Sequence, residues 1–234
     1  MPDWLVMVIV IVGFVLAVGL LFWWLVQKSL RRTAAIQTIA ADRGWVFKED
    51  ENPDLIRNRF QSIPIFNKGN SYTCSNLMLG KIDDFEIWIC DYLYWGHAKQ
   101  THGGQEVSVS SSQKQRQTVI CLRYPEANLP AFDINLNLGL AKLTEYDPKN
   151  AIVLAGALDF SKKYMVCVAE DADKEVVTRL FTEEIQSLFP TDAKLKVQVS
   201  GNEMMITNYS LEIKATELEG YIHTVLSIGK SLNG

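Results

Sequence analysis

The chain opens with a run in which nearly every position is apolar. Residues 4–26 carry no charged side chain. As a helix this run measures about 34 Å, which is enough to cross a hydrocarbon core of about 30 Å. Within that core, a helix is the structure that lets a single segment satisfy its own backbone. We therefore predict a transmembrane anchor with a short N-terminal tail over residues 1–27.

The pattern stays helical after the anchor. Residues 29–42 contain good helix formers and neither Gly nor Pro, and Gly44 follows as a C-terminal stop. This predicts a rigid juxtamembrane stalk over residues 28–44. A soluble domain is expected over residues 45–234, either as one unit or subdivided near residues 145–160.

Alternating and short apolar runs in the soluble part predict strands, and runs with helical spacing predict helices. Residues 85–95 have apolar side chains on both faces, which is typical of a central strand. Sequential hairpins with helices between them predict an α+β fold, a mostly antiparallel sheet packed by helices. The helices expected are residues 53–60, 138–143, 172–189 and 216–232, and the strands expected are residues 45–47, 72–82, 85–95, 117–124, 131–136, 164–169, 194–199 and 203–208.

One segment breaks this pattern. Residues 96–115 are rich in Ser and Gln, hold His97 and His102, and contain few apolar residues. Such a composition predicts a mobile loop.

Charged residues flank the anchor unequally. Asp3 precedes it, whereas Lys28, Arg31 and Arg32 follow it directly. Because positive residues stay on the cytoplasmic side, we expect the N-terminus outside and the soluble domain in the cytoplasm. A cleaved signal peptide is the alternative, but it would need a positive n-region and a shorter apolar core.

Tryptophans mark both ends of the span, about 28 Å apart along the helix, as in an aromatic belt. The basic residues could attract anionic headgroups, but three charges suit a topology signal better than a dedicated lipid site. The residues predicted at the membrane interface are Trp4, Trp23, Trp24, Lys28, Arg31 and Arg32.

Overall charge and cysteine usage narrow the setting. The net charge of −4 argues against nucleic acid as the main partner. The four cysteines are widely spaced and form no Cys-x-x-Cys pair. We expect reduced thiols in or near the core, where they behave as small hydrophobes. Two disulfides in an exported domain are the alternative.

Asp91 is the main candidate for chemistry, because a carboxylate on an apolar strand face needs a partner. It is either a general base or ligand contact, or a structural partner of a backbone amide, a tyrosine or an arginine such as Arg116 or Arg123. With His97 and His102 it would supply the acid–base groups of an enzyme. The spacing of these residues matches no metal site, and we expect neither metal nor cofactor. No nucleophile elbow, phosphate loop or dinucleotide fingerprint is present.

A series of short signatures along the chain resembles a group of bacterial single-pass membrane-anchored proteins of unassigned function. The resemblance implies a bacterial inner-membrane setting and supplies no activity or catalytic residue. The signatures are RGWVF at 43–47, DY at 91–92, QTV at 117–119, LPAF at 129–132, FSKKY at 160–164 and LF at 180–181.

These observations favour a membrane-tethered cytoplasmic binding domain, non-enzymatic, that acts on a membrane protein partner. An enzyme on a membrane-associated substrate and a structural subunit of a membrane complex are the alternatives. Homo-oligomerisation stays open. The predicted contact surface is Tyr92, Tyr94, Trp95, His97 and His102.

Overall fold

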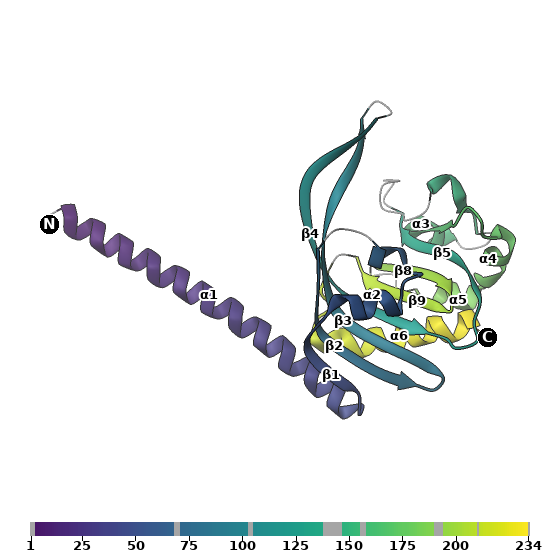
Figure 1. Cartoon of the computed structure of the whole chain (residues 1–234), viewed down its shortest axis with the longest axis horizontal. Helices are drawn as coiled ribbons and strands as arrows, with labels where there is room; N and C mark the ends of the chain where they lie inside the picture. Colours follow the sequence, from purple (N-terminus) through teal and green to yellow (C-terminus); the bar gives the residue numbers. More distant parts are fainter. Residues whose placement is uncertain are drawn as a thin grey trace.

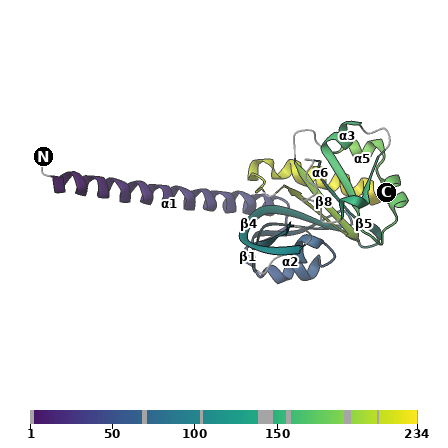
Figure 2. The same ribbon diagram turned by 90° about the horizontal axis from the view of Figure 1, so that it is seen from above.

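The structure is a computed structural model of the chain. A long helix, α1, projects from a folded body that contains a sheet and shorter helices (Figure 1; Figure 2). For residues 95–102 and 105–114 the description covers the backbone and not the side chains. The residues that the structure describes are 3–67, 71–102, 105–137, 147–154, 158–189, 194–209 and 211–233.

Helix α1 (Asp3–Asp42) is 40 residues long, about 60 Å at the usual helical rise. It continues through the basic residues after the anchor, as predicted. Gly44 ends it with a φ of +65°, which favours glycine. The amides of Gly44 and Trp45 then bond to Ala41 O at 3.0 Å and Ala40 O at 2.8 Å.

The two halves of α1 have different surroundings. Among the described helices, α1 alone has the length and apolar composition to cross a membrane, and its most apolar window is not buried in the fold. Near its C-terminal end, Ile36 and Ala40 are buried in the main core. The exposed apolar run therefore continues directly into a helix that belongs to the domain.

The described strands form one antiparallel sheet in the order β1-β2-β3-β4-β9-β8-β5-β7-β6. Together with the packed helices it confirms the predicted α+β fold. The strands are β1 (Val46–Glu51), β2 (Ser71–Ile82), β3 (Phe85–His102), β4 (Gln105–Arg123), β5 (Leu129–Leu136), β6 (Ala151–Ile152), β7 (Tyr164–Val168), β8 (Leu195–Gly201) and β9 (Glu203–Asn208). The further helices are α2 (Pro53–Arg59), α3 (Leu158–Lys163), α4 (Lys174–Leu180), α5 (Glu183–Ser187) and α6 (Ala215–Asn233), with the 3-10 turns η1 (Pro64–Asn67) and η3 (Pro148–Asn150).

Both faces of the sheet are covered. The larger core lies between one face and helix α6, the end of α1 and the region of α3 to α5. A smaller core lies on the other face beneath α2 and η1. In β3, Ile87 and Ile89 enter the larger core, while Trp88 and Cys90 enter the smaller one. The prediction that this strand is central is therefore confirmed.

The mobile loop predicted over residues 96–115 is wrong. Strands β3 and β4 continue through it as a hairpin, with His97 opposite Ser112 and His102 opposite Gln105. In the described pairings β2 leaves β3 at Trp95, so beyond that point the two strands pair with each other alone. Figure 1 shows this ribbon extending past the rest of the sheet. We call residues 96–102 and 105–115 the arm.

The arm was missed in the sequence because a strand is recognised from alternating apolar residues, and this segment contains few apolar residues. A second difference lies at residues 172–189, predicted as one helix. There the chain breaks at Phe181, and Thr182 caps α5 by accepting a hydrogen bond from the Ile185 amide. The helix predicted at 138–143 lies outside the described residues, and the subdivision near 145–160 stays a prediction.

Helix α6 approaches the sheet most closely at Gly229. A Cβ atom at this position would lie 2.1 Å from Tyr124 Oη and 3.0 Å from Leu122 Cδ1. The absence of a side chain at Gly229 thus lets the helix rest on the buried tyrosine.

Replacing Gly229 with Ala should lower the free energy of unfolding by about 1–3 kcal/mol, because the new methyl group overlaps Tyr124. Gly220→Ala is the matched control on the same helix, since no atom lies within 4 Å of its added Cβ. The control should raise the free energy by about 0.5–1 kcal/mol. Thermal unfolding of the full chain in detergent, followed by circular dichroism, compares the two. An unchanged midpoint for G229A would contradict the expectation.

Candidate functional site

A buried ion pair joins α1 to the sheet beneath it. Asp91 in β3 pairs with Arg32 of α1, which lies 59 positions earlier in the chain. The expectation of Arg116 or Arg123 as the partner is wrong. Helix α1 packs across β1 and β2 and so brings Arg32 to β3, whereas Arg116 pairs with Glu212.

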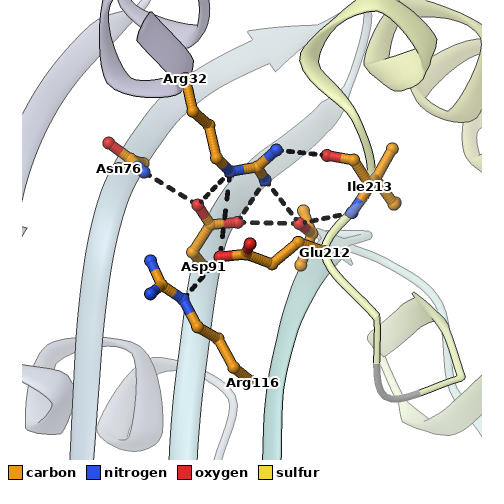
Figure 3. A network of polar contacts seen from close by, with 7 residues as sticks. Arg32, Asn76, Asp91, Arg116, Glu212 and Ile213 are labelled. Atoms are coloured by element: carbon orange, nitrogen blue, oxygen red, sulfur yellow. Dashed lines mark hydrogen bonds and ion pairs between the residues drawn. The ribbon is translucent and has the colours of Figure 1, made fainter. Parts of the chain in front are cut away.

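The two side chains meet in a bidentate contact. Arg32 Nε lies 2.9 Å from Asp91 Oδ2, and Arg32 Nη2 lies 2.6 Å from Asp91 Oδ1. Asn76 Nδ2 also donates to Oδ2, and Thr118 Oγ1 donates to Oδ1, both at 2.8 Å. The carboxylate thus uses about four acceptor positions, which is its full capacity. Figure 3 shows Arg32 pointing from α1 onto this carboxylate.

The guanidinium also binds the segment that precedes α6. Arg32 Nη1 donates to Ile213 O at 2.5 Å, and the Ile213 amide donates to Thr118 Oγ1 at 3.0 Å. Glu212 lies 4.0 Å from Arg32 and forms a 2.5 Å ion pair with Arg116 Nε, next to the base of the arm (Figure 3). We call the connected set the joint; its residues are Arg32, Asn76, Asp91, Arg116, Thr118, Glu212 and Ile213.

Burial makes a partner obligatory for Asp91. Its side chain is 1% exposed, and that of Arg32 is 14% exposed. Taking each charge out of water costs several kcal/mol, which their attraction offsets only when the geometry is good and the remaining polar atoms are bonded. The charged groups of Asp91 and Arg32 meet both conditions, whereas Asn76 Oδ1, also in the joint, is buried without a hydrogen-bond partner among the described residues. Removal of either charge alone would leave the other buried without compensation.

This geometry suits a structural role for Asp91. A general base must come within hydrogen-bond reach of a substrate proton, whereas the Asp91 oxygens are enclosed and already bonded. His97 follows Asp91 by six positions on β3, a span of about 20 Å in a strand, and His102 lies about 16 Å further. The backbone therefore spreads the three candidate acid–base residues along one strand. It does not gather them.

The predicted contact surface is partly wrong. Tyr92 is fully buried in the smaller core, where its ring centroid lies 5.1 Å from that of Phe66. Burial raises the pKa of its hydroxyl well above the ordinary value. Tyr94 is half-buried and donates its hydroxyl hydrogen to Gln115 Oε1. The Trp95 backbone pairs with Ser71 on β2. The sequence did not reveal that α2 and η1 cover this face.

The thiols are inert residues of the core. All four cysteines are free and buried, which confirms their predicted place in the core, while their reduced state stays a prediction. Burial raises the pKa of Cys90 and of Cys121, and so keeps both protonated and poorly nucleophilic. Among the described residues, no group of three or more His, Cys, Asp or Glu side chains could hold a metal ion. His223 on α6 is exposed.

The basic residues after the span divide into two groups. Lys28 and Arg31 are exposed, and the Lys28 ammonium lies 5.6 Å from the centroid of the Trp24 ring. Arg32 was predicted to lie with them at the membrane interface, but its guanidinium lies in the joint. A place at the membrane interface therefore stays a prediction for the exposed residues Trp4, Trp23, Trp24, Lys28 and Arg31.

Four residues of the joint escaped sequence reasoning. The partners of Asn76, Thr118, Glu212 and Ile213 lie between 15 and 181 positions away in the chain. Such contacts depend on the packing of α1 and of the segment before α6. Asn76 alone of these is marked by its local structure: it is a non-glycine residue with a φ of +52° at an irregularity in the pairing of β2 with β3.

No family model and no curated protein sequence matches the chain. Its fold is similar to that in the crystal structure of the mycobacterial trehalose monomycolate transport factor A, TtfA. The similarity covers 86% of this chain and 93% of that chain, with a TM-score of 0.58 and 15% sequence identity. At this identity the likeness shows a shared fold.

Replacing Asp91 with Ala should lower the free energy of unfolding by about 3–5 kcal/mol, because Arg32 then stays buried without a counter-charge. Glu212→Ala serves as control: this side chain is 34% exposed, and its loss should cost less than about 1 kcal/mol. Urea unfolding of the full chain in detergent measures both. If D91A behaved like E212A, the ion pair would have no structural importance.

Proposed function

We propose that the protein is a membrane-tethered, non-enzymatic accessory factor that binds a membrane-embedded partner in a bacterial transport process. Its folded domain lies at the cytoplasmic face of the inner membrane. The domain acts by contact, and the arm provides the main contact surface.

The docking of α1 into the domain is the observation that supports this proposal. The apolar half of the helix is exposed, while Ile36 and Ala40 of the same helix lie in the larger core. A flexible linker would let the domain sample a wide volume, whereas a continuous helix keeps it close to the membrane surface. This raises its effective concentration near membrane-bound partners.

The arm is suited to contact because it is an extended element on a firmly packed base. In the described pairings its outer edges carry no neighbouring strand, and its polar composition is typical of edges that stay soluble until a specific partner binds. Trp95, His97 and His102, whose backbones lie in or beside the arm, are proposed contacts together with Tyr94 at its base.

The likeness to TtfA supports the transport part of the proposal. That protein is a transport factor by its name, and the present chain has a similar fold over 86% of its length. The burial of Asp91 supports the non-enzymatic part, since the strongest candidate acid–base group is committed to Arg32.

The domain should be protected when proteases are added to intact spheroplasts, because Lys28 and Arg31 hold the end of the span on the cytoplasmic side. The same proteases added to inverted membrane vesicles should digest it. Immunoblotting with an antibody against the C-terminal helix reads both experiments, with a periplasmic protein as control. Digestion of the domain in intact spheroplasts would contradict the orientation.

Shortening the arm should abolish partner capture while leaving the domain folded. Residues 98–111 are replaced by Asn-Gly, which suits a two-residue hairpin turn between the paired His97 and Ser112. Crosslinking in native membranes, mild detergent extraction and mass spectrometry then compare the shortened and full chains. Recovery of the same membrane proteins at the same yield from both chains would exclude the arm as the contact surface.

A further inference from the structure

The joint is the contact of α1 with the domain that lies nearest to the membrane. Ile36 and Ala40 pack deeper in the domain, and Arg43 at the far end pairs with the exposed Glu219 of α6. Arg32 reaches 59 positions to Asp91 and 181 positions to Ile213. Arg32 thus ties α1 both to the sheet and to the segment before α6, at the end of the docked region that is nearest to the apolar run.

Helix geometry makes the ion pair sensitive to the position of α1. A shift by one residue turns a helix by about 100°, which takes Arg32 off the face that meets Asp91. A tilt of about 10° would move Trp4, about 42 Å away along the helix, by about 7 Å. Ile36 and Ala40 are non-directional apolar contacts. A bidentate arginine–carboxylate contact demands a planar match and so tolerates little rotation.

The joint also extends to the base of the arm. Thr118 of β4 bonds to both Arg32 and Asp91, and Arg116, two residues nearer to the arm, is held by Glu212. Ion pairs thus connect Asp91, Arg32, Glu212 and Arg116 in sequence, from α1 to the residue next to the base of the arm (Figure 3).

We propose that Arg32 and Asp91 are positioning residues that fix the direction of α1 relative to the sheet, and thereby the direction in which the arm faces the membrane. The purpose of this fixed direction rests on the proposed function, because a partner in the membrane would then contact the helix and the arm in one defined relative orientation. An apolar pair could hold α1 as tightly, but the ion pair with its four acceptor contacts defines an orientation as well.

Distance measurement between spin labels tests the proposal on the full chain in lipid nanodiscs. Cysteines replace Phe14 on α1, far enough from Arg32 to report a tilt of the helix, and His223 on α6, both exposed. The native cysteines are buried, and the chain without added cysteines controls for their labelling. The parent should give one narrow distance distribution. Arg32→Ala should widen it about twofold, because the directional contact is lost; the exposed neighbour Arg31→Ala should leave it unchanged.

A second variant guards against unfolding. Arg32→Gln combined with Asp91→Asn removes both charges and leaves no lone charge buried. Circular dichroism should show it folded, and its distance distribution should be as wide as that of R32A. Distributions as narrow as the parent's in both variants would overturn the proposal.

The spin-label experiment needs no partner, so its outcome is independent of the proposed function. Narrow distance distributions in both variants, together with partner capture that depends on the arm, would refute the positioning role of Arg32 and Asp91 and leave the proposed function intact. Wide distributions with no partner captured by any chain would refute the proposed function alone. Partner capture by R32A equal to that by R31A, despite a widened distribution, would overturn the proposed purpose of the fixed direction.

Discussion

A carboxylate placed on a strand that is buried on both faces must find a positive charge, and this requirement organises the molecule. Asp91 cannot reach water, and the charge that satisfies it comes from Arg32, outside the sheet. For that contact to form, α1 must lie across the sheet at a set position. In that position Ile36 and Ala40 lie in the larger core, and the segment before α6 accepts a hydrogen bond from Arg32 through Ile213 O.

Packing in the smaller core fixes the part of β3 from which the arm extends. Beneath α2 and η1, Tyr92 packs against Phe66 at 5.1 Å and Tyr72 at 6.0 Å between ring centroids. Glu86 of β3 pairs with Arg59 of α2. Partial burial raises the pKa of Glu86, but hydrogen bonds from Arg59 and Trp88 and the positive charges of Arg59 and Lys81 together outweigh it. The net shift of the pKa is downward, so the pair stays charged at neutral pH. A long polar ribbon is marginal alone, and these contacts fix the strands from which it extends.

Local features of the sequence were enough for the elements and for the class of fold. The apolar run, the glycine that ends α1 and the two-sided character of β3 each act within a few residues, and the structure has them where they were expected. The polar segment at 96–115 was misread because the strand signal rests on alternating apolar residues, and this segment has few of them. Residues 172–189 were misread because Thr182 can both continue a helical spacing and cap a new helix.

Only part of the candidate site could be predicted from the sequence, and the reason is different from that for the fold. Burial of Asp91 follows from its apolar neighbours on β3, so the need for a partner could be predicted. The identity of the partner could not, because Arg32, Arg116 and Arg123 have the same charge and differ only in where tertiary packing places them. Arg32 also had a sufficient explanation as a topology signal, which concealed its second role. A residue with one evident function can thus hide another.

The separation of the joint's members along the chain has a consequence for biosynthesis. The ribosome makes Arg32 early and Ile213 181 residues later, so at about 5–20 residues per second the arginine waits about 10–40 s for its last ligand. During that interval the newly inserted helix is anchored in the bilayer while its guanidinium remains hydrated. The contacts of the joint therefore form late in synthesis. Until then, the orientation of the nascent domain relative to α1 is not fixed.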